Sequence, residues 1–219
     1  MRLRFILATP VLLLSMAGWS AEPVASAPKL VRIHVEAPEY PPTARRFNVS
    51  GTVTAKMRVE ADGHVSKTEV VLSPADILSE AVVAATAKWR YEPIAQPYDG
   101  VVQIPFQLTG GDDSYAFGTD VRPFAAPLPT AAAELGVELT EGWSHVRLII
   151  DEAGAVIGKL VLKSSGPEFD ASCQAILAAL KFSPASQGDL GTRKKATVNL
   201  FFIHVVPGGE IRIAHYSGV

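Results

Sequence analysis

The side chains of this chain that could do chemistry are few and lie far apart in the sequence. Its histidines have neither the helical spacing of metal ligands nor a neighbouring cysteine pair, so the sequence gives zinc little support. His64 lies in an expected hairpin turn, where a solvated imidazole is the simpler interpretation. The full set is His34, His64, His145, His204 and His215. We therefore expect neither a metal site nor a cofactor.

The other reactive groups also have ordinary explanations. Ser164-Ser165-Gly166 lacks the flanking glycines of a nucleophile elbow, and serines before a helix commonly act as caps. Asp112-Asp113 with Asp120 could attract calcium, but we favour a solvated acidic linker. Because no nucleophile, base and metal set converges, we expect a protein that is not an enzyme.

The single cysteine, Cys173, excludes an intramolecular disulfide, so each folded unit must be held together by its core. Cys173 shares a predicted helical face with apolar neighbours, and we interpret it as a buried side chain rather than a reactive thiol. Those neighbours are Phe169, Ile176, Leu177 and Leu180.

The first residues have the pattern of an export signal. Arg2 and Arg4 precede an apolar run over residues 5–17, and small residues up to Ala21 offer a cleavage site. The run is shorter than the roughly 20 apolar residues that a membrane-spanning helix needs. We predict that residues 1–21 are a signal peptide and that the mature protein lies outside the cytoplasm. It would be membrane-anchored only if the leader stays uncleaved.

The composition is that of a globular protein, with 48% hydrophobic and 19% charged residues and a net charge of −2. This charge gives no indication of a nucleic-acid surface. Arg45-Arg46 and Arg193-Lys194-Lys195 are most simply solvated charge, although a peripheral contact with lipid head groups is compatible with them.

The elements that would position these residues occur twice. The segment 51–93 recurs without insertion as 142–184, with every position displaced by 91. Apolar character recurs at this offset, which indicates two copies of one folding unit. Matching pairs are Met57 with Leu148, Val59 with Ile150, Val71 with Leu162, Leu78 with Phe169, Trp89 with Leu180 and Tyr91 with Phe182.

Each copy predicts the same order: short helix, hairpin, long helix and closing strand. The short helix is expected because proline is tolerated in a first helical turn. The hairpin is expected from the alternation of apolar and polar residues around an Asp-Gly turn, and the long helix from its apolar face. In the first copy these are residues 40–47, strands 53–59 and 65–72, a helix carrying Ile77 to Trp89, and strand 101–108. In the second they are residues 128–133, strands 146–150 and 156–163, helix 169–182 and strand 196–205.

The remaining segments connect or follow these units. We expect a linker over residues 110–127, and Tyr115, Phe117 and Phe124 make it apolar enough for part of it to pack against a domain. An extra strand is expected from Glu210 to His215. The predicted domains are therefore residues 30–109 and 128–206, followed by a C-terminal tail over 207–219.

The first copy contains several short motifs in a fixed order, spanning about residues 37–108, the whole of that copy. The motifs are Tyr40-Pro41, Gly51-Thr52-Val53, Asp62-Gly63-His64-Val65, Val70-Val71-Leu72-Ser73 and Trp89-Arg90-Tyr91-Glu92-Pro93. Taken together, they resemble the C-terminal domain of the TonB family of periplasmic energy transducers. The second copy is more divergent, since its segment 180–184 keeps the aromatic residue and the proline but lacks the tryptophan.

The resemblance implies an α+β fold, with each domain a three-stranded antiparallel sheet that carries two helices on one face. In this family an extended peptide of an outer-membrane transporter pairs with the sheet edge near the last strand. An edge strand suits this role because its backbone donors and acceptors are open. The candidate edges are strands 101–108 and 196–205. The first consists of Val101, Val102, Gln103, Ile104, Pro105, Phe106, Gln107 and Leu108.

The function expected is that of a periplasmic protein without its own membrane anchor. It would bind a transporter or another envelope protein by sheet-edge pairing. A first alternative is a structural scaffold in which the same edges pair with each other, within one chain or in a homodimer. A second is an anchored energy transducer, if the leader is retained.

Overall fold

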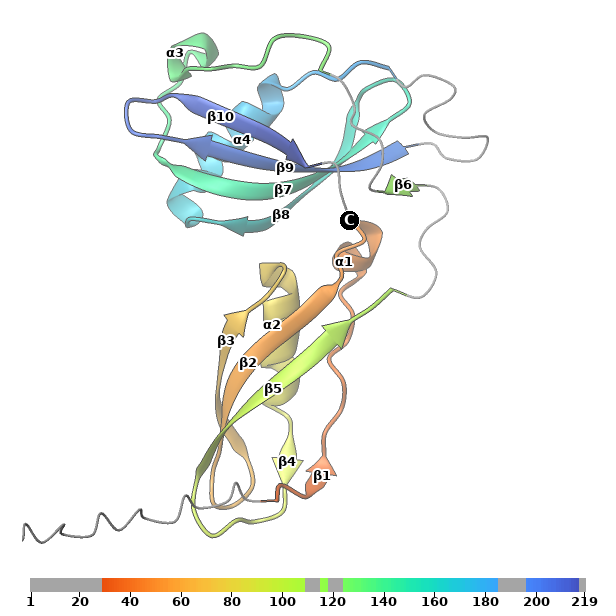
Figure 1. The fold of residues 1–219 in the computed structure, drawn as a ribbon, viewed down its shortest axis with the longest axis vertical. Helices are drawn as coiled ribbons and strands as arrows, with labels where there is room; N and C mark the ends of the chain where they lie inside the picture. Colours follow the sequence, from red (N-terminus) through yellow and green to blue (C-terminus); the bar gives the residue numbers. More distant parts are fainter. Residues whose placement is uncertain (1–28, 109–114, 118–123, 185–195, 217–219) are drawn as a thin grey trace, which may run out of the picture.

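The computed structural model describes residues 29–108, 115–117, 124–184 and 196–216. These residues form two sheet-based units stacked end to end, so that the molecule is elongated (Figure 1). We call residues 29–108 the first unit and the described residues from 115 to 216 the second unit. The α+β class expected from the sequence is confirmed.

The first unit has a three-stranded antiparallel sheet, in which β2 lies between β3 and β5. Alternate residues of β2, from Val53 to Val59, are buried beneath the helices, as their period of two predicts. The elements are α1 (Pro42–Arg46), β2 (Gly51–Val59), β3 (Val65–Leu72), α2 (Asp76–Thr86) and β5 (Tyr98–Phe106).

A small second sheet closes the far end of the first unit, where β1 (Arg32–His34) pairs with β4 (Arg90–Tyr91). Helix α2 ends at Thr86, earlier than the apolar pattern through Trp89 suggests. Trp89 lies in the turn beyond the helix and is buried, and its Nε1 donates a 2.8 Å hydrogen bond to the carbonyl of Glu36. Tyr91, in β4, is buried as well.

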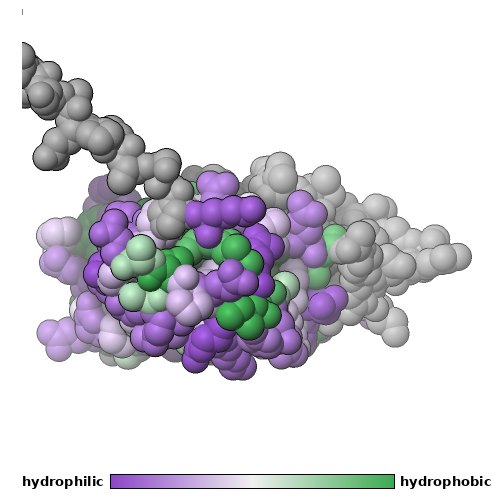
Figure 2. Space-filling view, turned by 90° about the horizontal axis from the view of Figure 1, so that it is seen from below, coloured by the Kyte–Doolittle hydropathy of each residue, from purple (hydrophilic) through white to green (hydrophobic). Residues whose placement is uncertain are grey.

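The same end of the molecule has a largely hydrophilic surface with hydrophobic groups gathered near its centre (Figure 2). Val31 and Ile33, in and beside β1, are among the exposed large hydrophobic residues of the chain.

The second unit repeats this plan with a larger sheet, in which the strand order is β10-β9-β7-β8 and β6 lies parallel beside β9. Two of its five strands come from segments outside the repeat, namely the predicted linker and the predicted tail. Its elements are β6 (Tyr115–Phe117), α3 (Ala132–Leu135), β7 (Gly142–Asp151), β8 (Val156–Ser164), the 3-10 helix η1 (Pro167–Phe169), α4 (Asp170–Ala179), β9 (Ala196–Val205) and β10 (Ile211–Tyr216).

The core of the second unit lies between α4 and one face of this sheet. Phe169, Phe201 and Ile203 are fully buried there. Cys173 is 1% exposed in the same cluster, and burial raises the pKa of its thiol. The interpretation of Cys173 as a core side chain is therefore confirmed.

None of the helices in the described parts of the chain is long and apolar enough to cross a membrane. The predicted signal peptide, residues 1–21, lies outside the described residues.

Candidate functional site: an open sheet edge and a closed one

The sheet of the first unit has two edge strands, β3 and β5, and β5 is the one that carries the predicted site. The strand order β3-β2-β5 leaves one side of β5 without a partner strand among the residues that the structure describes, as Figure 1 shows. Of the residues predicted for the site, 101–106 lie in this strand, whereas Gln107 and Leu108 follow its end. Six of the eight predicted positions therefore belong to a sheet edge.

The register of β2 fixes which groups of β5 point outward. The amide of Glu60 donates a 2.8 Å hydrogen bond to the carbonyl of His64, on the β3 side, so even-numbered residues of β2 direct their backbone groups toward β3. Odd-numbered residues therefore face β5, where Val53 pairs with Ile104. The even-numbered partners on β5 are hydrogen-bonded to β2, and the outward-directed residues are Asp99, Val101, Gln103 and Pro105.

Side chains on the two faces give this edge two different borders. On the helix-covered face, Val102 and Ile104 are partly buried against a cluster that includes Val35. On the other face, Val101 is 65% exposed, and Asp99 accepts a 2.9 Å hydrogen bond from Arg58. A strand added to β5 would therefore lie beside apolar side chains on the helix-covered face of the sheet and beside exposed apolar and charged side chains on the other face.

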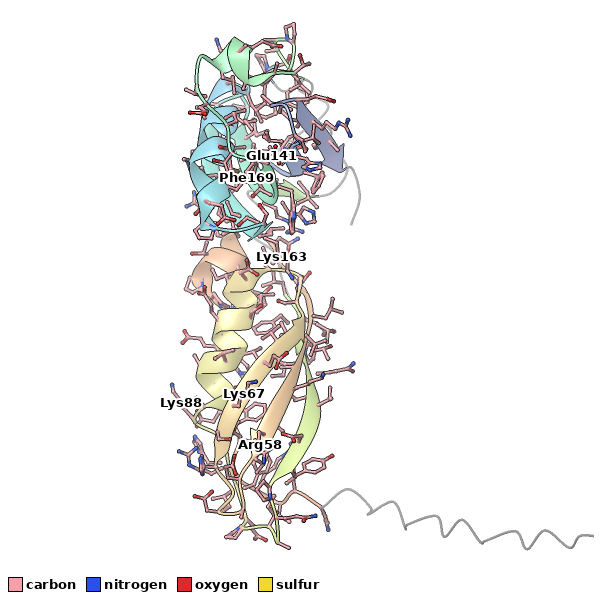
Figure 3. All side chains as sticks on the ribbon, turned by 90° about the vertical axis from the view of Figure 1, so that its left-hand side faces the viewer. Arg58, Lys67, Lys88, Glu141, Lys163 and Phe169 are labelled. Carbon is pink, nitrogen blue, oxygen red and sulfur yellow. The ribbon has the colours of Figure 1, made fainter. Side chains whose placement is uncertain are left out.

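The outer face of the first sheet carries a shallow, largely charged hollow. Arg58 of β2 and Lys67 of β3 are labelled on the strands of this sheet in Figure 3. The lining residues are Lys56, Met57, Arg58, Lys67, Glu69, Asp99, Gly100 and Val101. The hollow therefore borders β5 at the middle of its length.

The second candidate edge, Ala196–Val205, is not open, and this expectation was wrong. Strand β10 pairs with residues 200–205 of β9, and β6 pairs with residues 196–198. The physical reason lies in the tail, where Ile211 is buried and Ile213 packs against the same core. Burial of these two side chains holds β10 against β9.

The two units meet at the end of helix α1. Asn48 adopts a left-handed conformation, with φ of 51°, just after the helix. Arg147 of β7 uses its Nη1 to donate hydrogen bonds of 2.7 Å to the carbonyl of Phe47 and 2.5 Å to that of Asn48. Burial lowers the pKa of Arg147, and the nearby Tyr40 opposes that shift. The guanidinium satisfies carbonyls that the end of the helix leaves without partners.

Apolar packing surrounds this hydrogen-bonded contact. Ile149 and Leu162 of the second sheet are buried in one cluster with Ala44 and Phe47 of the first unit. A Cβ on Gly158 would lie 3.2 Å from Cζ of Phe47. The second sheet is thus covered on one face by α4 and on part of the other by the first unit. We call this contact the junction.

The junction was not foreseen from the sequence, although the repeat contains a signal for it. At the offset of 91, three charged residues on the outer face of the first unit's sheet correspond to uncharged residues in the sheet of the second unit. Arg58 corresponds to Ile149, Lys67 to Gly158 and Glu69 to Leu160. An outer sheet face that loses its charges in one copy is a face that becomes covered.

Aromatic and imidazole rings continue the same sheet face beyond the junction. The ring centres of His145 lie 5.2 Å from Trp143 and 5.0 Å from Phe202, and His204 lies 6.0 Å from Phe202. Burial, and secondarily the positive charge of Lys163, lower the pKa of His145. Figure 3 shows Lys163 near the level at which the two units meet.

The remaining candidates for chemistry do not converge. Within the described ranges, no group of three or more His, Cys, Asp or Glu residues is arranged to hold a metal ion. His64 pairs with Asp62 in the exposed hairpin turn, and His215 contacts Asn199 in the second sheet. Ser165 accepts a 3.1 Å hydrogen bond from the amide of Trp143 and does not cap a helix. Asp112-Asp113, Asp120 and Arg193–Lys195 lie outside the described residues.

Comparison with known proteins finds similar sequences for the first unit. Residues 36–108 match the family described as the Gram-negative bacterial TonB protein C-terminal. Protein TonB of Escherichia coli K12 is 35% identical over 89 residues, which are 40% of this chain and 36% of that protein. Protein TonB of Klebsiella pneumoniae is 33% identical over 94 residues, 42% of this chain and 38% of that protein. This chain thus spans well under half the length of these relatives.

A solved structure also resembles the chain. The solution NMR structure of the Pseudomonas aeruginosa TonB C-terminal domain has 21% sequence identity to this chain and a TM-score of 0.35. The aligned region covers 40% of this chain and 95% of the Pseudomonas aeruginosa chain. The family match confirms the resemblance expected from the motifs of the first copy.

Proposed function

Because residues 36–108 match the TonB C-terminal family, we propose that this protein is a periplasmic recruiter of envelope proteins. Its first unit binds an extended segment of a partner, such as an outer-membrane transporter, along the outer side of β5. The protein is related to TonB-dependent transport through this domain and acts without catalysis.

The observation that carries the proposal is the missing partner strand at β5 within the described residues. An edge of this kind offers main-chain hydrogen bonds that tolerate many sequences, while neighbouring side chains select among them. Residues Val102 and Ile104 give the inner border of the edge its apolar character.

The second unit, which we propose is a divergent copy of the first, has another task. Its corresponding edge is occupied by β6 and β10, and its outer sheet face packs against α1 through the junction. It therefore supports the first unit as a rigid platform and does not recruit a strand at β9.

Site-specific photocrosslinking in the native envelope tests the proposal. A benzophenone amino acid replaces Gln103, beside the open edge, and in a control protein replaces Lys67, in β3 on the other side of the sheet. We expect crosslinks to a foreign envelope protein from position 103 and not from position 67. Equal labelling from both positions, or none from position 103, contradicts recruitment at β5.

The same experiment separates the scaffold alternative. A crosslink from position 103 to a second copy of this chain favours self-association through β5 over recruitment. N-terminal sequencing of the mature protein tests its location, because a start near Ala21 supports a cleaved signal peptide and an intact leader supports the anchored transducer.

A further inference from the structure

The outward-directed amides of β5 are bounded at both ends by proline. Pro105 lies in the outward-directed set, and Pro97 directly precedes the strand. Proline has no backbone N–H, so neither residue can donate to an added strand. We propose that these two prolines restrict the edge to a short docking window, residues 99–103, in which Asp99, Val101 and Gln103 supply the donors. This inference rests on the proposed function of β5 as a recruiting edge.

The position of Pro105 is compatible with the sheet only in this orientation. A proline directed toward β2 would remove a hydrogen bond from the ladder, whereas one directed outward costs the sheet nothing. The hydrogen bond from Glu60 to His64 independently assigns odd-numbered β2 residues, and hence even-numbered β5 residues, to the β2–β5 ladder. Both observations indicate that the backbone of Pro105 faces away from β2.

The second unit supplies an internal comparison. Gly51 pairs with Phe106 in the first sheet, and its counterpart Gly142 pairs with Val205 in the second. By this register Pro105 corresponds to His204 and Pro97 to Ala196. Strand β9, which lacks prolines at these positions, is paired on its outer side by β10 and β6. Strand β5, which has them, has no outer partner among the described residues.

The chemistry of the window defines the kind of segment that fits. The segment is extended and about five residues long within the paired region, since the window covers residues 99–103. Positions opposite Val102 point to the partly buried inner border and favour apolar side chains. Beyond Gln103 a longer foreign strand finds no N–H donor at Pro105, whose carbonyl can only accept, so the ladder of paired hydrogen bonds is incomplete there. Proline on an edge is a known protection against unlimited strand pairing.

Amide hydrogen exchange of the mature full-length chain, measured by NMR, tests the geometry without a partner. We expect the amides of Asp99, Val101 and Gln103 to exchange about tenfold or more faster than those of Gly100, Val102 and Ile104. The reverse pattern, or equal protection of both sets, overturns the window.

Peptide length tests the proline boundary. The probes are synthetic peptides of alternating threonine and valine, with seven and eleven residues, fused to a soluble carrier. For the wild-type protein we expect equal affinity for both lengths and new protection only at Asp99, Val101 and Gln103. In Pro105→Val, which adds a donor, the longer peptide should bind about threefold to tenfold more tightly than the shorter one. A Gln107→Val variant, altered beyond the strand, is the control and should show no length dependence.

The outcomes separate the two proposals. Longer peptides that gain affinity on the wild-type protein, or equal gains in Pro105→Val and Gln107→Val, overturn the proline boundary while recruitment at β5 stands. Failure of every peptide and of the crosslink at position 103, with the exchange pattern as expected, overturns recruitment. In that case the amides of Asp99, Val101 and Gln103 point outward, but they do not bind a partner.

Discussion

Phe47 and Gly158 lie against each other across the junction, with Cζ of Phe47 3.2 Å from the position that a Cβ on residue 158 would take. A larger side chain at 158 must therefore push against the Phe47 ring and against Ile149, whose Cδ1 would lie 3.1 Å from that Cβ. We predict that Gly158→Val destabilises the protein by about 1–3 kcal/mol through overpacking. Urea denaturation measures the loss, and small-angle X-ray scattering should show a larger radius of gyration.

Lys67 offers the matched control, because it is the counterpart of Gly158 on the uncovered outer face of the first sheet. Lys67→Val should leave both the unfolding transition and the radius of gyration unchanged. Equal effects of the two substitutions would show that the units do not pack at Gly158.

Arg147 should be the polar residue on which the junction depends most. Arg147→Met keeps much of the side-chain volume but leaves the carbonyls of Phe47 and Asn48 without their donor. We expect a loss of about 2 kcal/mol in the free energy of unfolding, since hydrogen bonds to a charged donor exceed neutral ones. Arg212→Met, which breaks an exposed pair with Glu210, is the control and should have no measurable effect. Similar denaturation midpoints for the two variants would contradict this role of Arg147.

Trp89 should stabilise the first unit by its volume and by its hydrogen bond to Glu36. We predict that Trp89→Phe lowers the free energy of unfolding by about 1–3 kcal/mol, because it leaves a small cavity and a carbonyl without its donor. Trp143→Phe alters a partly exposed ring in the second unit and serves as the control. A variant Trp89→Phe as stable as Trp143→Phe would argue against the core role of Trp89.

His145 should make stability depend on pH. Its pKa is below the ordinary value of 6.5 in the folded protein because partial desolvation of the ring and Lys163 disfavour the imidazolium, although His145 is an exposed residue, so the effect on stability is small. The unfolded chain therefore binds more protons just below pH 6.5, and stability should fall as the pH drops from 6.5 through the folded pKa. NMR titration of the imidazole measures that pKa directly.

His145→Gln should flatten this part of the profile of melting temperature against pH, whereas His34→Gln, an exposed control, should not. A titration midpoint of His145 at or above 6.5 would refute the assignment.

The repeat and its elements could be predicted from local patterns, whereas the roles of the two edges could not. Alternation in β2, the Asp-Gly turn and the buried Trp89 follow from spacing and residue type, and the structure has them. The closed edge at β9 depends on pairings with β6 and β10, which are distant in sequence or lie outside the repeat. Such pairings leave little local pattern. The length of α2 was overestimated because an apolar face does not show where a helix ends.

The junction was missed for a different reason. Matching positions at the offset of 91 shows where the two copies agree, but the contact lies where they differ, as with Lys67 and Gly158. Comparison of the unlike positions would have indicated a covered face.

The pairing of β10 with β9 also bears on solubility. Of the two closing strands, β9 lacks proline at the positions that correspond to Pro97 and Pro105, so only β6 and β10 cover its outer amides. A truncated form without β10 would present bare β-structure to other molecules and would be prone to aggregate. Strand β10 therefore shields main-chain donors and acceptors of β9 from pairing with strands of other molecules.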